Sequence, residues 1–299
     1  MKNLSLIEIR NVSKYFGKTK VLDNISFNIP ENSIIGILGP NGSGKSTLMR
    51  IIAGLIRSWE GEILFEGQPV RDNNRYLHRL GFLIEDPAFY EHLTADENLK
   101  MLARLTESPI TDIVSVLEKV NLRGCGDKLV YQFSYGMKQR LGIAQSILND
   151  PSVIFLDEPS NGLDPHGIIQ MNNIIRGLNK QGKTICISTH VIEQVKELCS
   201  HIVILKEGGI ILNDSVQNLL SRSTKYEMES SNIQNTKQKL SSIEDLVIVH
   251  ETKTKLIVDS KLSLSQMLKT LHTDSALNGI NKQLDLSLIH ISEPTRPPE

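Results

Sequence analysis

Residues 39–47 read Gly-Pro-Asn-Gly-Ser-Gly-Lys-Ser-Thr and match the pattern G-x-x-x-x-G-K-[ST]. The apolar run Ile34–Leu38 precedes them and is typical of a buried parallel strand. Residues 48–53 follow and are apolar at helical spacing. The motif therefore lies between a predicted strand and a predicted helix, which is the context that a phosphate-binding loop requires.

The residue types of this loop suit the phosphates of a nucleotide. Glycines let the backbone curl so that several N–H groups point at phosphate oxygens, and the next helix directs the positive end of its dipole there. Lys45 adds a charge for the β- and γ-phosphates, and Ser46 offers a hydroxyl to Mg²⁺. The alternative is a glycine-rich turn with a surface lysine, which the flanking strand and helix disfavour. The other candidate ligands of ATP in the loop are Gly39, Asn41, Gly42, Ser43, Gly44 and Thr47.

Length and composition restrict the class of protein. A chain of 299 residues accommodates one large domain and a small one, and a net charge of −1 gives no basic patch for nucleic acid. Cys125, Cys186 and Cys199 form no C-x-x-C pair, so we expect unreactive thiols rather than metal ligands. No apolar run approaches the ~18–20 residues of a membrane span, and the N-terminus lacks the apolar core of a signal peptide. We therefore expect a cytoplasmic chain, soluble or peripheral to a membrane.

Two further predicted strands end in polar residues. Four apolar residues, 153–156, precede Asp157 and Glu158, and a strand from Thr184 delivers His190. Ligands of open α/β sheets bind beyond the carboxyl ends of the strands, where an acid pair suits metal and water beside phosphate. The alternative is a strand that simply reaches solvent, and the phosphate loop upstream weakens it.

Alternating residues around Ile7–Ile9 and Ile25–Ile29 predict half-buried strands near the N-terminus. Tyr15 and Phe16 lie between them, and either a base-stacking role or a place in the core fits their spacing. Thr94 and Glu97 have capping-box spacing and open a helical insertion that shows no strand signal before residue 131.

Ser134 and Gly136 begin the next predicted helix, which runs to Leu148. Taken alone, the serine is an ordinary helix N-cap, and the glycine allows close approach of a large group.

The composition changes after Ser223, so we place a first domain at residues 1–222 and a small α+β region at 223–285. Short strands are predicted at 226–229, 246–250 and 256–259, and helices at 235–243 and 263–271. This region carries no catalytic motif. Residues 286–297 resemble a translated sequencing adapter, so we expect 286–299 to be a non-native tail.

The motifs follow one another in a characteristic order. After the phosphate loop come E-D-P (85–87), the helical insertion, S-Y-G-M (134–137), L-D-E (156–158), N-G-L-D (161–164) and S-T-H (188–190). Over roughly residues 4–220 this order resembles the ATP-binding subunit of an ABC transporter. The resemblance implies an α/β P-loop NTPase core of ABC type, with an antiparallel β subdomain and a helical subdomain, beside the α+β appendage.

The resemblance also implies roles for individual residues. Phe16 would stack on adenine, and Asp164 would lie in a loop that crosses a dimer interface. Ser134 and Gly136 would reach the ATP of the opposite subunit, so that one chain alone has no complete site. The implied catalytic residues are Glu158 as general base, His190 at the γ-phosphate and Lys45, and the implied Mg²⁺ ligands are Ser46, Glu85 and Asp157.

Two departures from the family pattern matter. The signature reads F-S-Y-G-M instead of L-S-G-G-Q, so Tyr135 stands where glycine is usual and Met137 replaces a polar residue. Because the serine and the second glycine are kept, we expect ATP binding to survive. Glu85 replaces the usual glutamine, as in the subgroup that protects bacteria against lantibiotics and bacitracin-like peptides. A shift of one residue would instead make Asp86 the equivalent.

The resemblance implies that two copies enclose two ATP molecules and drive a pair of transmembrane permease subunits. The chain would lie on the cytoplasmic face of the membrane and power export of a peptide antibiotic or another drug. Residues 88–97, with Phe89 and Tyr90 expected to be exposed, would receive a helix of the membrane subunit.

Other functions of the same ATPase class are less compatible with the chain. Chromosome-maintenance members need a long coiled-coil insertion, translation-type members two ATPase halves, and zinc-bearing repair members cysteine clusters. The chain has one phosphate loop and a compact insertion. Glu158 argues against a regulator that binds ATP without hydrolysing it, although the altered signature keeps that reading open.

Overall fold

The computed structural model describes residues 5–71, 74–106, 113–240, 246–260, 262, 266, 267 and 277–282. The chain divides into two units, Met1–Asn213 and a second unit that begins at Asp214.

A six-stranded sheet forms the centre of the first unit, in the order β10-β9-β3-β8-β7-β6. Neighbouring strands from β9 to β6 pair in parallel. Every residue of β3, β7 and β8 is buried, as the apolar runs of β3 and β7 predict. The strands are β3 (Ile34–Leu38), β6 (Leu80–Leu83), β7 (Val153–Asp157), β8 (Thr184–Thr189), β9 (His201–Lys206) and β10 (Gly209–Ser215).

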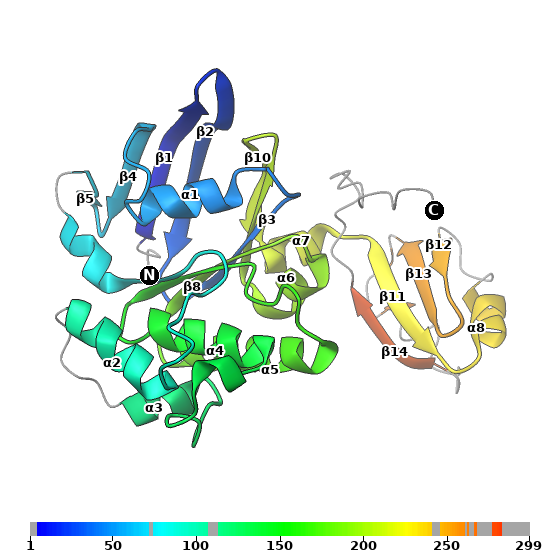
Figure 1. Ribbon diagram of the computed structural model, residues 1–299. Coiled ribbons are helices and arrows are strands. Elements are labelled where there is room, and N and C mark those ends of the chain that lie inside the picture. Colours follow the sequence, from blue (N-terminus) through cyan, green and yellow to red (C-terminus); the bar gives the residue numbers. More distant parts are fainter. Residues whose placement is uncertain are drawn as a thin grey trace. The chain divides into compact units, whose positions relative to one another are not determined.

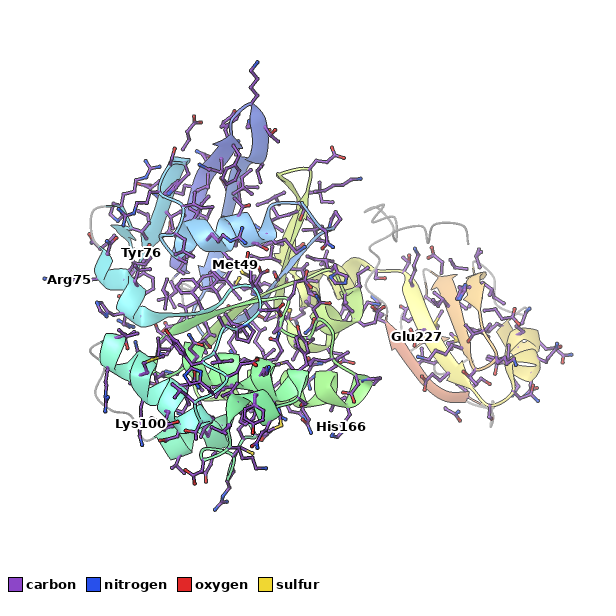
Figure 2. All side chains as sticks on the ribbon, viewed as in Figure 1. Met49, Arg75, Tyr76, Lys100, His166 and Glu227 are labelled. Atoms are coloured by element: carbon purple, nitrogen blue, oxygen red, sulfur yellow. The ribbon has the colours of Figure 1, made fainter. Side chains whose placement is uncertain are left out.

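A second, antiparallel sheet has the order β2-β1-β4-β5. Its strands are β1 (Ser5–Phe16), β2 (Thr19–Pro30), β4 (Glu60–Phe65) and β5 (Gln68–Pro69). Helix α1 (Lys45–Ile52) lies between this sheet and the central one, as Figure 1 shows, and one apolar core joins all three. Met49 of α1 and Tyr76 of the 3₁₀ helix η1 (Asn74–Arg79) belong to that core (Figure 2), where the Tyr76 hydroxyl donates to Ile52 O at 3.0 Å.

The predicted insertion is helical. It contains α2 (Ala95–Leu105), α3 (Ile113–Lys119) and the 3₁₀ helix η2 (Val130–Gln132), and α4 (Tyr135–Ser146) follows. The capping box is confirmed, because Thr94 Oγ1 accepts from Glu97 N at 3.1 Å and Glu97 Oε2 accepts from Thr94 N at 2.8 Å. α4 and α5 (Pro165–Lys180) lie on the side of the central sheet opposite α1 (Figure 1), and α6 (Ile192–Leu198) packs on β3 and β8.

The second unit contains a four-stranded antiparallel sheet in the order β12-β13-β11-β14. Its elements are α7 (Val216–Arg222), β11 (Lys225–Ser230), α8 (Ile233–Leu240), β12 (Leu246–Glu251), β13 (Lys255–Ser260) and β14 (Leu277–Lys282). One face buries Tyr226, Met228 and Val258 around α8. With Gln266 and Met267 helical between β13 and β14, the order is that of a ferredoxin-like fold.

The three strands predicted in this unit are confirmed, whereas β14 was not predicted. The predicted helix at 235–243 begins earlier, at Ile233, and ends at Leu240 within the described part. The predicted helix at 263–271 falls largely outside the described residues, and the predicted tail at 286–299 falls entirely outside them.

Candidate active site

The phosphate loop curls between β3 and α1 because two of its glycines occupy space that no side chain can share. A Cβ on Gly39 would lie 2.4 Å from Leu205 O. Gly44 has φ +103°, and a Cβ there would lie 2.5 Å from Leu22 Cδ2. Gly42 also has positive φ, at +81°. A Cβ on Gly42 would meet none of the described atoms within 4 Å, so the loop is open to a ligand there, whereas Gly39 and Gly44 lie against atoms of the chain itself.

Two polar side chains of the loop are buried. Ser43 Oγ has no hydrogen-bond partner among the described groups, and an unpaired buried hydroxyl of this kind fits a site for phosphate. Lys45 is 5 % exposed, and its Nζ donates to Gly39 O at 2.8 Å and to Pro40 O at 3.3 Å. Ser46 and Thr47 are half-buried on the first turn of α1. A cradle of glycines with one buried ammonium suits a polyphosphate.

Asp157 and Glu158 stand at the carboxyl end of β7, as predicted. Asp157 is buried and its Oδ1 accepts a hydrogen bond from Ser188 Oγ. The Ser188 hydroxyl also accepts from Glu158 N at 2.9 Å, so one side chain of β8 holds both acids. Glu158 has φ +47°, a backbone conformation that is uncommon outside glycine and is often associated with functional sites.

The Glu158 carboxylate joins the phosphate loop to β8. His190 Nδ1 lies 3.0 Å from Glu158 Oε2, and Lys45 Nζ lies 3.4 Å from Oε1. Within the described part of the chain Oε1 accepts no hydrogen bond. The three residues predicted as catalytic, from three separate elements, therefore meet at one point.

The loop after β6 brings two more acids to this side of the sheet. Glu85 has φ +66°, is 65 % exposed and pairs with Arg50 of α1. Asp86 Oδ1 accepts from Tyr135 OH at 2.9 Å and from Gln139 Nε2 at 3.2 Å. Both acids line a cavity of about 190 Å³ together with Asp157 and Glu158. Glu85 and Asp157, two of the predicted metal ligands, are therefore neighbours across one cavity.

Ser134 and Gly136 lie apart from this cluster. Ser134 caps α4 by accepting from Met137 N at 3.3 Å, as its ordinary role as an N-cap predicts. With Asp164, which caps α5, the two residues line a separate cavity of about 260 Å³. His166, labelled in Figure 2, lines the same cavity from the first turn of α5.

The two aromatic residues at the end of β1 are both exposed, Tyr15 at 43 % and Phe16 at 50 %, so the alternative that either belongs to the core is wrong. The Lys14 ammonium lies 4.7 Å from the centre of the Phe16 ring. One expectation for the loop at 88–97 is also wrong: Tyr90 is exposed, but Phe89 is half-buried.

Sequence reasoning missed the residues that hold the site together. Ser188, Arg50 and Gln139 contact Asp157, Glu85 and Asp86 respectively. Arg50 and Gln139 lie outside the motifs, and Ser188 begins the S-T-H motif without having been assigned a role. In the sequence Tyr135 stands out only because the family signature has glycine at this position, and its hydrogen bond to Asp86 is not predictable from the pattern. Burial raises the pKa of Tyr135, and the hydrogen bond to Asp86 adds to the rise, so the phenol stays a proton donor at neutral pH.

The cysteines lie away from this chemistry. Cys186 and Cys199 are free and buried, and burial raises both pKa values, that of Cys199 to about 12. Among the residues described, no group of three or more metal-ligating side chains occurs. In the same part of the chain no helix has the length and apolar character needed to span a membrane.

Known proteins share these features. Residues 22–161 match the ABC transporter family model. The lantibiotic transport ATP-binding protein SrtF of Streptococcus pyogenes is 41% identical over 217 residues, which are 72% of this chain and 94% of SrtF. The bacitracin transport ATP-binding protein BcrA of Bacillus licheniformis is 39% identical over 225 residues, 74% of each chain.

Solved structures agree with the fold. An ATP-binding cassette of an ABC transporter in its ADP conformation superposes with a TM-score of 0.66 at 26% identity, covering 73% of this chain and 95% of that one. A dimeric cassette in a post-hydrolysis state, with ADP and phosphate, gives 0.63 at 27% identity over 70% and 98%. The predicted ABC-type core is confirmed.

This chain belongs to the ABC transporter family. It is the ATP-binding subunit of such a transporter, an ATPase that works with transmembrane permease subunits.

Proposed function

We propose that this ATPase powers the export of a membrane-active peptide antibiotic of the lantibiotic or bacitracin class. Two relatives at about 40% identity are transport proteins for such peptides. The observation that carries the proposal is Glu85, an acid at the carboxyl end of β6 that lines one cavity with Asp157 and Glu158. Its charge is offset by Arg50.

In this proposal the loop from Gly39 to Thr47 holds the phosphates of ATP. Backbone N–H groups of Asn41, Gly42 and Gly44 surround the phosphates, and Ser43 Oγ gains the partner that its burial requires. Lys45 exchanges its bonds to Gly39 O and Pro40 O for phosphate oxygens. Phe16, exposed at the end of β1, stacks on the adenine.

Mg²⁺ fits the oxygen donors present, which are the Ser46 hydroxyl and the carboxylates of Asp157 and Glu85. When bound, the ion neutralises charge on the phosphates. Ser188 keeps Asp157 in place by donating to it, which leaves the second carboxylate oxygen for the metal.

Glu158 is the general base in this account. Its carboxylate accepts a proton from the attacking water, and the 3.0 Å contact with His190 fixes its orientation. The Ser188 hydroxyl, 2.9 Å from Glu158 N, holds the backbone in its φ +47° conformation. His190 itself then lies beside the γ-phosphate.

A second copy of the chain completes each site. Ser134 and Gly136 line their own cavity, apart from the cluster around Glu158, which supports their contact with the ATP of a partner subunit. Asp164 lines the same cavity and would lie at the interface between the two copies. A homodimer with two enclosed ATP molecules is the simplest assembly of this kind.

The proposed location is the cytoplasmic face of the membrane, with residues 88–97 receiving a helix of the permease. This segment presents Tyr90 to solvent, and Asn98 fixes its shape. Asn98 Oδ1 accepts from Tyr90 N at 2.9 Å, and its Nδ2 donates to Tyr90 O and Thr94 O at 3.1 and 2.8 Å. A rigid loop with an exposed aromatic suits a docking helix.

The test is resistance in a sensitive bacterial host that expresses the chain with the polytopic membrane protein encoded beside it. Susceptibility to a lantibiotic, to bacitracin and to an unrelated drug would be measured. We expect protection against a peptide antibiotic that disappears with Lys45→Ala, while expression and membrane association persist. Protection that is retained in Lys45→Ala, or a pair that protects only against the unrelated drug, would contradict peptide export.

A further inference from the structure

Tyr135 lies between two cavities of the first unit. The cavity of about 260 Å³ is lined by Ser134 and Gly136, and the cavity of about 190 Å³ by Asp157 and Glu158. Among the described residues Tyr135 alone lines both. A glycine at this position, as in the usual family signature, has no side chain that reaches from one cavity to the other.

The hydroxyl of Tyr135 closes a triangle of hydrogen bonds on the side of the smaller cavity. It donates to Asp86 Oδ1 at 2.9 Å and accepts from Gln139 Nε2 at 2.9 Å, and Gln139 Nε2 also lies 3.2 Å from Asp86 Oδ1. Asp86 follows Glu85 directly, so the triangle ties the start of α4 to the loop that carries Glu85.

The ring of Tyr135 packs against a third segment. Gly162 has φ +72°, and a Cβ added to it would lie 3.1 Å from Tyr135 Cε1. Gly162 stands in the turn between Glu158 and Asp164, where Asn161 N donates to Glu158 O at 3.0 Å. Tyr135, the first residue of α4, therefore contacts both the loop that carries Glu85 and the turn after β7.

We propose that Tyr135 couples the two ATP sites of the dimer. The inference rests on the proposed function, in which Ser134 and Gly136 contact the partner's ATP while Asp157 and Glu158 act on the chain's own. Movement of the signature on the partner's ATP displaces Tyr135 and, through Asp86, the Glu85 loop of the other site. Tyr135 is a positioning residue, because it reaches the reacting groups through Asp86 and the turn.

A purely structural role makes a different prediction. If the ring only fills space between α4 and Gly162, the hydroxyl is dispensable and phenylalanine serves equally well. Coupling instead requires the hydrogen bond to Asp86. Tyr135→Phe separates these roles, since it keeps the ring and removes the hydroxyl.

The experiment measures ATP hydrolysis by the full chain against ATP concentration. Two coupled sites give a Hill coefficient above 1, up to about 2 for two sites. We expect Tyr135→Phe to lower this coefficient toward 1. We also expect it to lower kcat about three- to tenfold, which corresponds to the usual contribution of one hydrogen bond. Binding of a fluorescent ATP analogue to the single chain should stay within about twofold of the wild type, because the hydroxyl of Tyr135 bonds to Asp86 and Gln139 and not to a residue of the phosphate loop among those described.

A double-mutant cycle makes the test specific. Asp86→Ala removes the other end of the bond, so Tyr135→Phe with Asp86→Ala should behave like Asp86→Ala alone. Tyr131→Phe, at an exposed tyrosine on η2, is the matched control and should match the wild type. Additive effects of the two substitutions would refute the link through the hydroxyl.

Three other outcomes separate this inference from the proposed function. ATP turnover that Lys45→Ala abolishes, with an unchanged Hill coefficient in Tyr135→Phe, overturns the coupling alone. A wild type with a Hill coefficient of 1 also overturns it. Turnover that Lys45→Ala leaves intact overturns the proposed ATP site itself.

Discussion

At the scale of single residues, the conformation of the site depends on side chains that fix other residues of the site by hydrogen bonds. Glu158 combines an uncommon φ of +47° with contacts to His190 and Lys45. Such a conformation persists only where the surroundings enforce it, and here Glu158 N donates to both Ser188 Oγ and Ser188 O. The geometry around Glu158 therefore depends on Ser188 as well as on the residues proposed to contact ATP.

Ser188→Ala tests this dependence. The change removes the donor to Asp157 and the side-chain acceptor for Glu158 N, so we expect the free energy of unfolding to fall by about 1–3 kcal/mol. We also expect kcat to fall, with the ATP affinity of the chain little changed. Chemical denaturation and steady-state ATPase assays measure the two effects. Ser152→Ala, which loses one exposed bond to Arg79 O, is the control and should change stability by less than about 0.5 kcal/mol. Equal effects of both variants would refute the assigned role.

The sequence predicted the chemical groups of the site but not their supports. The phosphate loop, Asp157-Glu158 and His190 are recognisable because each follows directly on a buried strand, so local pattern fixes their place. The Tyr135 bond to Asp86 joins residues 49 positions apart, and only the packing of α4 on β6 brings them together. Ser188 is part of the S-T-H motif, but its contact with Asp157 follows only from the register of β8 with β7.

At the scale of elements, the glycines differ in whether the fold leaves room for a side chain. Gly44 ends the phosphate loop and caps α1 with φ +103°. Gly177 lies inside α5, where an added Cβ would meet nothing within 4 Å among the described atoms. A side chain at Gly44 would therefore clash with its surroundings, whereas a side chain at Gly177 would not clash with any described atom.

A pair of alanine substitutions measures the contrast. Gly44→Ala should destabilise the chain by more than about 1 kcal/mol and weaken ATP binding, because its Cβ meets Leu22 and the backbone of Val21. Gly177→Ala should stabilise it by about 0.5–1 kcal/mol, since alanine is the better helix former. Thermal unfolding with and without ATP distinguishes them. A Gly44→Ala variant with unchanged stability and unchanged ATP binding would contradict this description of the loop.

Elements were predicted best where the pattern is long and uniform. The buried strands β3 and β7 follow from apolar runs, and the capped helix α2 follows from a capping box. β14 was missed because Leu277–Lys282 has only two apolar residues, and its strand character comes from pairing with β11. Phe89 was expected to be exposed, but it lies in a loop whose course depends on Asn98 and α2 rather than on local polarity.

At the scale of the whole molecule, burial of thiols links stability to pH. Cys199 packs against Gly36, where an added Cβ would lie 2.9 Å from its sulfur. Its pKa is raised from 9.0 to about 12 by burial. The unfolded thiol therefore loses its proton from about pH 9 upward, while the folded thiol keeps it until about pH 12. The stabilisation is complete below about pH 9 and is lost as the pH rises toward 12.

Cys199→Ala should remove this part of the pH dependence. We expect the difference in unfolding free energy between wild type and variant to be constant from about pH 7 to 8 and to shrink above about pH 9. Urea denaturation at a series of pH values measures it. A difference that stays constant up to about pH 10.5 would contradict a shifted Cys199 thiol.

In the proposed mechanism Glu158 is the general base for ATP hydrolysis, and a second copy of the chain must complete the site. Glu158→Gln tests both halves, because it keeps the shape of the side chain and removes the base. Hydrolysis should fall by about 10²–10⁴-fold while ATP binding persists.

The most direct measurement is therefore the mass of Glu158→Gln in solution, by light scattering, with and without ATP and Mg²⁺. We expect a single chain without nucleotide and a species of twice that mass at saturating ATP, and we expect Lys45→Ala in the same chain to abolish the larger species. A Glu158→Gln chain that binds ATP and stays a monomer would contradict it.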